Sequence, residues 1–177
     1  MKHTIYFSAA QNMSQLGDNS VDLVVTSPPY PMIEMWDDIM GNQNPEITFA
    51  LHSNKPRKAF ELMHQELDKV WSECWRVLKE GSFLCINIGD ATRTINGNFA
   101  LYNNNTRVIQ ACEELGFINL PNILWKKTTN APNKFMGSGM LPCGAYVTLE
   151  HEWILIFRKG NKRVYKKVSE KDARRDS

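Results

Sequence analysis

Residues 21–30, of sequence VDLVVTSPPY, decide the fold of this 177-residue chain. Apart from Asp22, residues 21–26 are apolar or β-branched, a composition typical of a strand buried on both faces of a sheet. Pro28 and Pro29 have no backbone N–H to donate to a sheet ladder, so strand pairing must stop at Ser27. The stretch therefore predicts a buried strand that ends abruptly in a stiff turn.

The flanking sequence predicts alternating strands and helices. Apolar runs indicate strands at residues 4–7, 83–88, 123–125 and 152–158, and helical spacing of apolar residues indicates helices at residues 56–79 and 106–115. Gly81 and Gly116 are expected to end the two helices, and residues 31–54 look irregular. This alternation is typical of a parallel α/β sheet, in which ligands bind beyond the carboxyl ends of the strands.

The turn that follows the first long strand offers an unusual set of polar groups. Its prolines leave backbone carbonyls as acceptors on a rigid turn, and Ser27 adds a hydroxyl. Tyr30 adds a flat face with a polar tip. Fixed acceptors beside an aromatic platform suit a planar group that carries an NH2, such as the exocyclic amine of a nucleobase. Inside a duplex that amine is stacked and paired, so the base must be flipped out.

Residues 22–30 resemble the catalytic motif of amino-methylating DNA methyltransferases, which is Ser, Asn or Asp followed by Pro-Pro and an aromatic residue. These enzymes move a methyl group from S-adenosylmethionine to N4 of cytosine or N6 of adenine. A serine at the first position is more like the cytosine-N4 branch. The position of the motif, ahead of the other segments, is similar to the permuted β group. The resemblance implies an α/β fold with a Rossmann-like methyltransferase sheet.

The resemblance also implies roles for individual residues. Ser27 and the Pro28 carbonyl would accept hydrogen bonds from the target amine, Pro29 would hold the turn, and Tyr30 would stack on the flipped base. These four residues form the expected catalytic set. Thr26 and Asp90, each near the end of a predicted strand, are the expected contacts to S-adenosylmethionine. For Asp90, a contact with the target base and an ordinary helix or turn cap stay open as alternatives.

Two features depart from the family pattern. Ser8 and Ala9 stand where family members often carry Gly-Asp near the cofactor adenosine, and the glycine-rich cofactor motif, similar to Asp-Pro-Phe-x-Gly-x-Gly, does not occur in the 177 residues. The sheet is therefore expected to be incomplete. A further C-terminal region or a second polypeptide would supply the missing motif. We expect a catalytic region over residues 1–160 and a basic segment over residues 161–177.

Cations and amides in one predicted loop suggest a nucleic-acid contact. These residues are Lys126, Lys127, Asn130, Asn133 and Lys134. Lysine suits phosphates, and asparagine suits adenine edges or phosphates. Residues 158–177 add nine basic and three acidic side chains, whereas the rest of the chain is mildly acidic. Double-stranded DNA is the expected partner, although a solvated basic terminus would also explain the charge.

Composition excludes several other classes of protein. Hydrophobic residues make up 42% and charged residues 23%, which argues against wholesale disorder. No apolar run is long enough to span a membrane, and the N-terminus does not look like a signal peptide. The four cysteines are far apart in sequence, which fits a reducing cytoplasm. No cluster has metal-ligand spacing, so no metal is expected.

The resemblance thus implies part of a DNA methyltransferase of a restriction–modification system, acting on cytosine N4 in preference to adenine N6. The reaction would be a direct displacement with no covalent enzyme–base intermediate. Two alternatives stay open at this point. One is an RNA or protein-amide methyltransferase, and the other is a non-catalytic half or subunit that binds nucleic acid.

Overall fold

Four strands form a mixed sheet within residues 3–127 and 149–164, the part of the chain that the computed structural model describes. In spatial order they are β1 (Val21–Thr26), β2 (Leu78–Ile88), β6 (His151–Lys159) and β5 (Phe117–Lys126). β1 and β2 are parallel, whereas β6 is antiparallel to both β2 and β5. The predicted parallel arrangement is confirmed for the β1–β2 pair and wrong for β6.

The direction of β6 follows from where it begins. Lys126, at the end of β5, pairs with His151, at the start of β6, so the chain re-enters the sheet at the edge it has just left. A strand parallel to β5 would have to begin beside the start of β5, which requires a crossover connection. Because β6 begins beside the end of β5, it can only be antiparallel to β5. The apolar run of β6 looks the same in either direction, which is why its sequence did not reveal this.

A long helix connects the two parallel strands. α3 (Pro56–Val77) has Pro56 in its first turn and buries one apolar face, including Trp71. The predicted helix over residues 56–79 is confirmed to within two residues. Gly81 does not end it, because the backbone becomes extended at Leu78 and Gly81 lies inside β2 with a φ of 72°. The second long helix, α4 (Asn104–Glu114), begins two residues earlier than predicted.

The stretch predicted to be irregular contains short helices. They are the 3-10 helix η1 (Glu34–Trp36), α1 (Asp37–Gln43) and α2 (Pro45–His52). The side chain of Asn44 accepts a hydrogen bond from the Glu46 N–H, and Pro45 occupies the first turn of α2. An Asn-Pro-Glu sequence is a helix start signal, which the scattered polar residues around it obscured.

Two further elements differ from the sequence prediction: a β-hairpin that was not predicted and a predicted strand that does not form. β3 (Ala91–Ile95) and β4 (Asn98–Tyr102) pair through a turn at Asn96 and Gly97, both with positive φ. Asn-Gly is a common hairpin turn, and sequence analysis overlooked it. The predicted strand at residues 4–7 does not form, and Phe7 is 97% exposed. No neighbouring strand pairs with that segment among the described residues.

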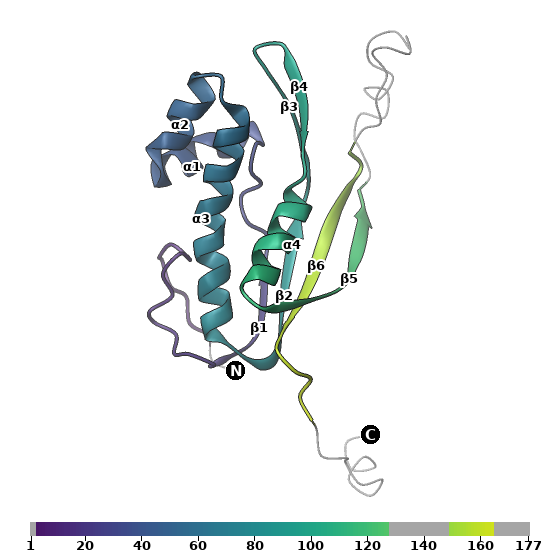
Figure 1. Cartoon of the computed structure of the whole chain (residues 1–177). Coiled ribbons are helices and arrows are strands. Elements are labelled where there is room, and N and C mark those ends of the chain that lie inside the picture. The colour runs from purple at the N-terminus through teal and green to yellow at the C-terminus, as the bar shows by residue number, and fades with distance from the viewer. Residues whose placement is uncertain (1–2, 128–148, 165–177) are drawn as a thin grey trace, which may run out of the picture.

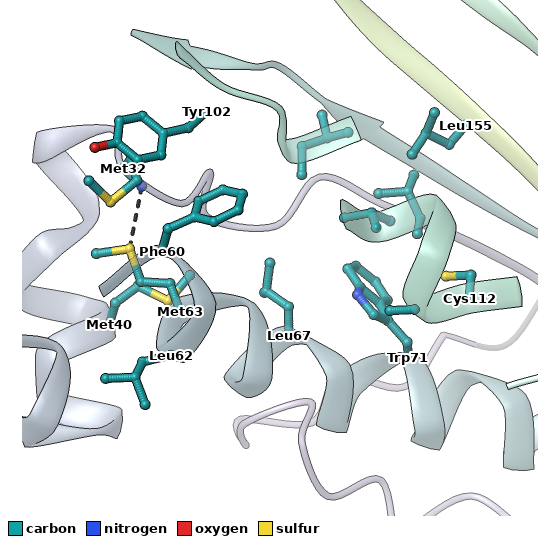
Figure 2. Close-up of a cluster of buried hydrophobic side chains, with 14 of the residues drawn as sticks. Met32, Met40, Phe60, Leu62, Met63, Leu67, Trp71, Tyr102, Cys112 and Leu155 are labelled. Atoms are coloured by element: carbon teal, nitrogen blue, oxygen red, sulfur yellow. Dashed lines mark hydrogen bonds between the residues drawn. The ribbon is translucent and has the colours of Figure 1, made fainter. Parts of the chain in front are cut away.

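The helices lie on one side of the sheet (Figure 1). Alternate residues of β2 and β6, such as Leu84 and Phe157, are paired in register and fully buried on that side. Figure 2 shows the core there, with Trp71 of α3 beside Cys112 of α4, and Leu155 of β6 farther along the same cluster. None of the described helices is long and apolar enough to cross a membrane.

The other face of the sheet is apolar and open to solvent among the described residues. The exposed large hydrophobic side chains of this face include Leu23, Val25, Phe83, Ile118 and Ile123. Strand register places them together, since Leu23 pairs with Phe83, which pairs with Arg158, which pairs with Ile118. Val25 of β1, which sequence analysis expected to be buried on both faces, is 72% exposed. We call these five residues the open sheet face.

Candidate active site

The Ser-Pro-Pro-Tyr turn lies where three strand ends meet. β1 and β2 are parallel, so the residues after Thr26 and the last residues of β2 share one edge of the sheet. β6 runs the other way, and its first residues therefore reach the same edge. This topology brings Ser27 and Tyr30 together with Asn87 of β2 and Glu152 of β6.

The Tyr30 hydroxyl joins these strand ends by hydrogen bonds. It lies 3.1 Å from Glu152 Oε2, 2.8 Å from Asn87 Nδ2 and 3.3 Å from Ser27 Oγ. Asn87 Nδ2 also donates to Glu152 Oε2 over 2.7 Å, and Lys127 Nζ lies 2.8 Å from Glu152 Oε1. Ser27, Tyr30, Asn87, Lys127 and Glu152 are called the Tyr30 cluster below.

A glycine allows the Tyr30 ring to sit against the sheet edge. A Cβ atom on Gly89 would lie 3.1 Å from Tyr30 Cε2 and 3.3 Å from Glu152 Cγ, closer than nine in ten Cβ contacts in proteins. The ring is thus held by packing at its edge and by hydrogen bonds at its hydroxyl. Such a side chain is pre-organised rather than free to rotate.

Burial and hydrogen bonds shift the pKa values of Tyr30 and Glu152 in opposite directions. Burial raises the pKa of the Tyr30 phenol above its ordinary value, and the charge and hydrogen bond of Glu152 act in the same direction. Burial opposes ionisation of Glu152, but hydrogen bonds from Lys127, Asn87 and Tyr30 prevail and lower the pKa of this carboxyl. Tyr30 is therefore a neutral phenol and Glu152 a carboxylate at neutral pH.

A fully buried asparagine, Asn104, is hydrogen-bonded to the backbone next to the turn. Asn104, the first residue of α4, donates through Nδ2 to the carbonyl oxygens of Pro31 and Gly89, each at 3.0 Å. Its Oδ1 lies 3.0 Å from Nε2 of the buried His64. Asn104 therefore ties the segment after the motif to the loop after β2. The first of these segments follows Tyr30, and the second contains Gly89 and the predicted cofactor contact Asp90.

The backbone just beyond the motif is strained. Met32 has a φ of 68°, in the left-handed region that side chains with a Cβ rarely adopt, and its side chain is fully buried. Its N–H donates to the Met63 sulfur at 3.3 Å (Figure 2). Strain of this kind persists where the surrounding structure imposes it, and it is enriched at functional sites.

The predicted residues are placed with different outcomes. Asp90 accepts from the backbone N–H of Asn105 at 3.0 Å and from its side-chain amide at 2.6 Å, so it caps the start of α4. Thr26 is the last residue of β1 and pairs with Ile86. Lys126 is exposed, whereas Lys127 belongs to the Tyr30 cluster. The predicted DNA contacts Asn130, Asn133 and Lys134 lie outside the described residues.

Sequence reasoning missed Asn87, Glu152 and Asn104. A signal existed for the first two, because each is a polar residue inside an apolar strand, and a buried polar side chain is an informative exception. Nothing in the sequence indicated that they would meet Tyr30. That contact depends on the antiparallel direction of β6.

Comparison with known proteins identifies the family. Residues 21–177 match the model of the DNA methylase family, N6_N4_Mtase. The Type II methyltransferase M.MjaI of Methanocaldococcus jannaschii is 51% identical over 175 residues, which cover 93% of this chain and 58% of the relative. M.MthZI of Methanothermobacter thermautotrophicus, also a Type II methyltransferase, is 50% identical over 176 residues, covering 99% and 50%. The chain thus spans little more than half the length of these relatives.

Solved structures share the fold. TTHA0409 from Thermus thermophilus, crystallised with S-adenosyl-L-methionine, has a TM-score of 0.63 and 29% identity, covering 95% of this chain and 59% of its own. The PvuII cytosine-N4-specific DNA methyltransferase has a TM-score of 0.53 and 18% identity, covering 89% and 49%. The predicted α/β methyltransferase fold is confirmed. With the family model matched over residues 21–177 and two relatives about half identical, the chain belongs to the DNA methylase family.

Proposed function

We propose that this chain is the base-binding and catalytic part of an S-adenosylmethionine-dependent DNA methyltransferase that modifies the exocyclic amine of a flipped base. Cytosine N4 is the favoured target, because Ser27 begins the motif, and adenine N6 is the alternative. The observation that carries this proposal is the position of the Ser-Pro-Pro-Tyr turn at the carboxyl ends of β1 and β2. There the hydroxyl of its Tyr30 is hydrogen-bonded to Asn87 and Glu152.

Each residue of the turn has a physical role in this proposal. Ser27 Oγ and the Pro28 carbonyl accept the two amine hydrogens and orient the nitrogen lone pair away from the base plane. Pro29 fixes the turn, and the Tyr30 ring stacks on the extruded base. The methylated nitrogen then releases its proton to water or to a nearby acceptor. No protein side chain is needed as a nucleophile.

S-adenosylmethionine supplies the sulfonium methyl group that the amine nitrogen takes up. Asp90 fits a contact with this cofactor even though Asn105 donates to both of its oxygens, since a carboxylate offers about four acceptor positions. Its negative charge suits the ammonium of the methionine end. Thr26, at the end of β1, is the second proposed contact. The remaining contacts are proposed to come from the glycine-rich motif of a further region or a second polypeptide.

The open sheet face supports the proposal of a further region. Exposed apolar patches on a protein usually mark a surface that another segment covers. The relatives carry roughly as much additional chain as is matched here, which is enough to cover such a face. We propose that the cofactor-binding region packs against Leu23, Val25, Phe83, Ile118 and Ile123.

Double-stranded DNA is the proposed substrate, in a restriction–modification system of the cytoplasm. The exposed Lys126 can approach a phosphate of the DNA. Asn130, Asn133 and Lys134 are the further proposed DNA contacts. Lys127 is the weaker candidate, because its ammonium lies 2.8 Å from Glu152 and 4.3 Å from the Trp125 ring centroid.

Methyl transfer to DNA tests the proposal directly. The chain is incubated with duplex DNA of mixed sequence and isotopically labelled S-adenosylmethionine, alone and with the additional region of a relative. Modified nucleosides are then identified by mass spectrometry. We expect N4-methylcytosine, lost in Ser27→Ala and Tyr30→Ala. A Ser14→Ala variant, on an exposed residue outside the cluster, is the matched control and keeps full activity.

Other products would change the conclusion in defined ways. N6-methyladenine would keep the reaction class and reverse the base. Methylated RNA or protein in place of DNA would replace the substrate class. DNA binding without any methylated product, even with the additional region present, would identify a non-catalytic binding subunit and overturn the proposal.

A further inference from the structure

The directions of the hydrogen bonds around Tyr30 follow from the chemistry of its partners. The Glu152 carboxylate can only accept, so the single phenol proton points at Glu152 Oε2, 3.1 Å away. The Asn87 amide nitrogen can only donate, so the phenol oxygen accepts from it over 2.8 Å. After these two contacts the Tyr30 hydroxyl has an acceptor position left and no proton.

This leaves one role for Ser27 toward Tyr30. The Ser27 Oγ lies 3.3 Å from the phenol oxygen, whose proton is already committed to Glu152. The serine must therefore donate its own proton to the phenol oxygen. Both lone pairs of the exposed Ser27 Oγ then remain available, and the serine presents itself to an entering group as an acceptor only.

We propose that Glu152, together with Asn87, is a positioning residue that orders these hydrogen bonds so that Ser27 offers only acceptors to the target amine. The proposal rests on the proposed function, because that amine is the group to be oriented. Without Glu152 the Tyr30 hydroxyl could donate to Ser27, and the serine proton would then turn toward the amine. Two donors would face each other, and the amine nitrogen would lose its orientation.

The orientation of the Asn87 amide agrees with this order of hydrogen bonds, although it leaves one polar atom without a partner among the described residues. Its Nδ2 bonds both Tyr30 and Glu152, while its Oδ1 is buried with no hydrogen-bond partner in the described part of the chain. The reverse orientation is disfavoured, because the amide oxygen would then face the carboxylate of Glu152, which Lys127 holds in place.

The phenol pKa of Tyr30 reports these directions without requiring catalysis. A hydrogen bond donated to the phenol oxygen stabilises the phenolate and lowers the pKa, and a nearby anion raises it. We therefore expect Glu152→Gln and Glu152→Leu to lower the Tyr30 pKa, and Ser27→Ala to raise it. The measurement is fluorine NMR of protein labelled with difluorotyrosine, whose lower intrinsic pKa allows titration of the folded protein. Tyr30→Phe assigns the signal.

Controls and contrary results are clear-cut in this experiment. The signal of Tyr102, which is buried in the core away from the cluster, should not change in any of these variants. A Tyr30 pKa that falls in Ser27→Ala would mean that the serine accepts from the phenol, which overturns the proposal. A Tyr30 pKa that is unchanged in both Glu152 variants would overturn it equally.

Methyl transfer kinetics then test the consequence for the reaction. Tyr30→Phe and Glu152→Leu should each lower kcat about tenfold with little change in KM for DNA, and the double variant should be no worse than Tyr30→Phe. Glu152→Gln, which keeps an acceptor oxygen, should retain more activity than Glu152→Leu. Additive losses in the double variant would contradict action through Tyr30. If the wild-type protein transfers no methyl group even with the additional region of a relative present, the proposed function fails, and the Tyr30 titration alone decides the hydrogen-bond order.

Discussion

At the scale of single residues, Gly89 sets how closely the Tyr30 ring approaches the sheet. A methyl group there must push the ring or Glu152 by a few tenths of an ångström, because the new Cβ would lie 3.1 and 3.3 Å from them. We expect Gly89→Ala to cost about 1 kcal/mol of stability, typical of mild overpacking, and about tenfold in methyl transfer. Urea unfolding and initial rates measure the two effects. Gly17→Ala is the matched control, since nothing lies within 4 Å of its Cβ position. Equal losses in both variants would show that the close approach is unimportant.

His64 is the residue through which acid should destabilise the fold. Burial lowers its pKa to about 3, well below the ordinary value near 6.5. The unfolded chain therefore binds a proton between these two values while the folded protein does not, so stability falls as the pH drops through 6.5. Between pH 7 and pH 5 the expected loss of unfolding free energy from this residue is about 2 kcal/mol. Urea unfolding at both pH values measures it. His64→Leu should remove this slope, whereas the exposed His52→Asn should leave it intact; a slope that persists in His64→Leu would assign it to other groups.

At the scale of elements, α2 depends on a cap that the sequence displays. The Asn44 side chain accepts from the Glu46 N–H at 3.1 Å and also donates to Glu66 at 3.2 Å. Asn44→Ala should therefore lower the unfolding free energy by about 1 kcal/mol or somewhat more, measured by urea unfolding. Asn42→Ala is the control, because Asn42 is an exposed residue inside α1 where alanine is the better helix former. No difference between the two variants would contradict the capping role.

The elements also show which parts of the structure can be predicted from sequence. α3 and the core of β2 were predictable because a long apolar periodicity or a continuous apolar run marks them locally. The turn at residues 27–30 was predictable because its prolines forbid strand pairing whatever surrounds it. The direction of β6 was not, because it depends on pairing with β5 across an intervening segment that carries no such signal. The meeting of Asn87 with Glu152 was not either, because these residues are 65 positions apart in the chain. Ser27 and Tyr30 could therefore be named in advance as members of one candidate site, whereas their contacts with the other strands required the topology.

At the scale of the whole molecule, we expect the open sheet face to be the surface through which the chain associates. Leu23 and Ile123 are 54% and 51% exposed, so placing a charge there should leave the unfolding free energy within about 0.5 kcal/mol. The same change removes apolar area from the patch that another segment would cover. We expect Leu23→Lys and Ile123→Lys to weaken self-association of the chain, measured by sedimentation velocity over a range of concentrations. Both should also weaken its binding to the additional region of a relative. Ile39→Lys is the matched control, since Ile39 is 45% exposed but lies on α1, away from that face. If Ile39→Lys has the same effect as the other two, association depends on net charge and the open sheet face is not the contact surface.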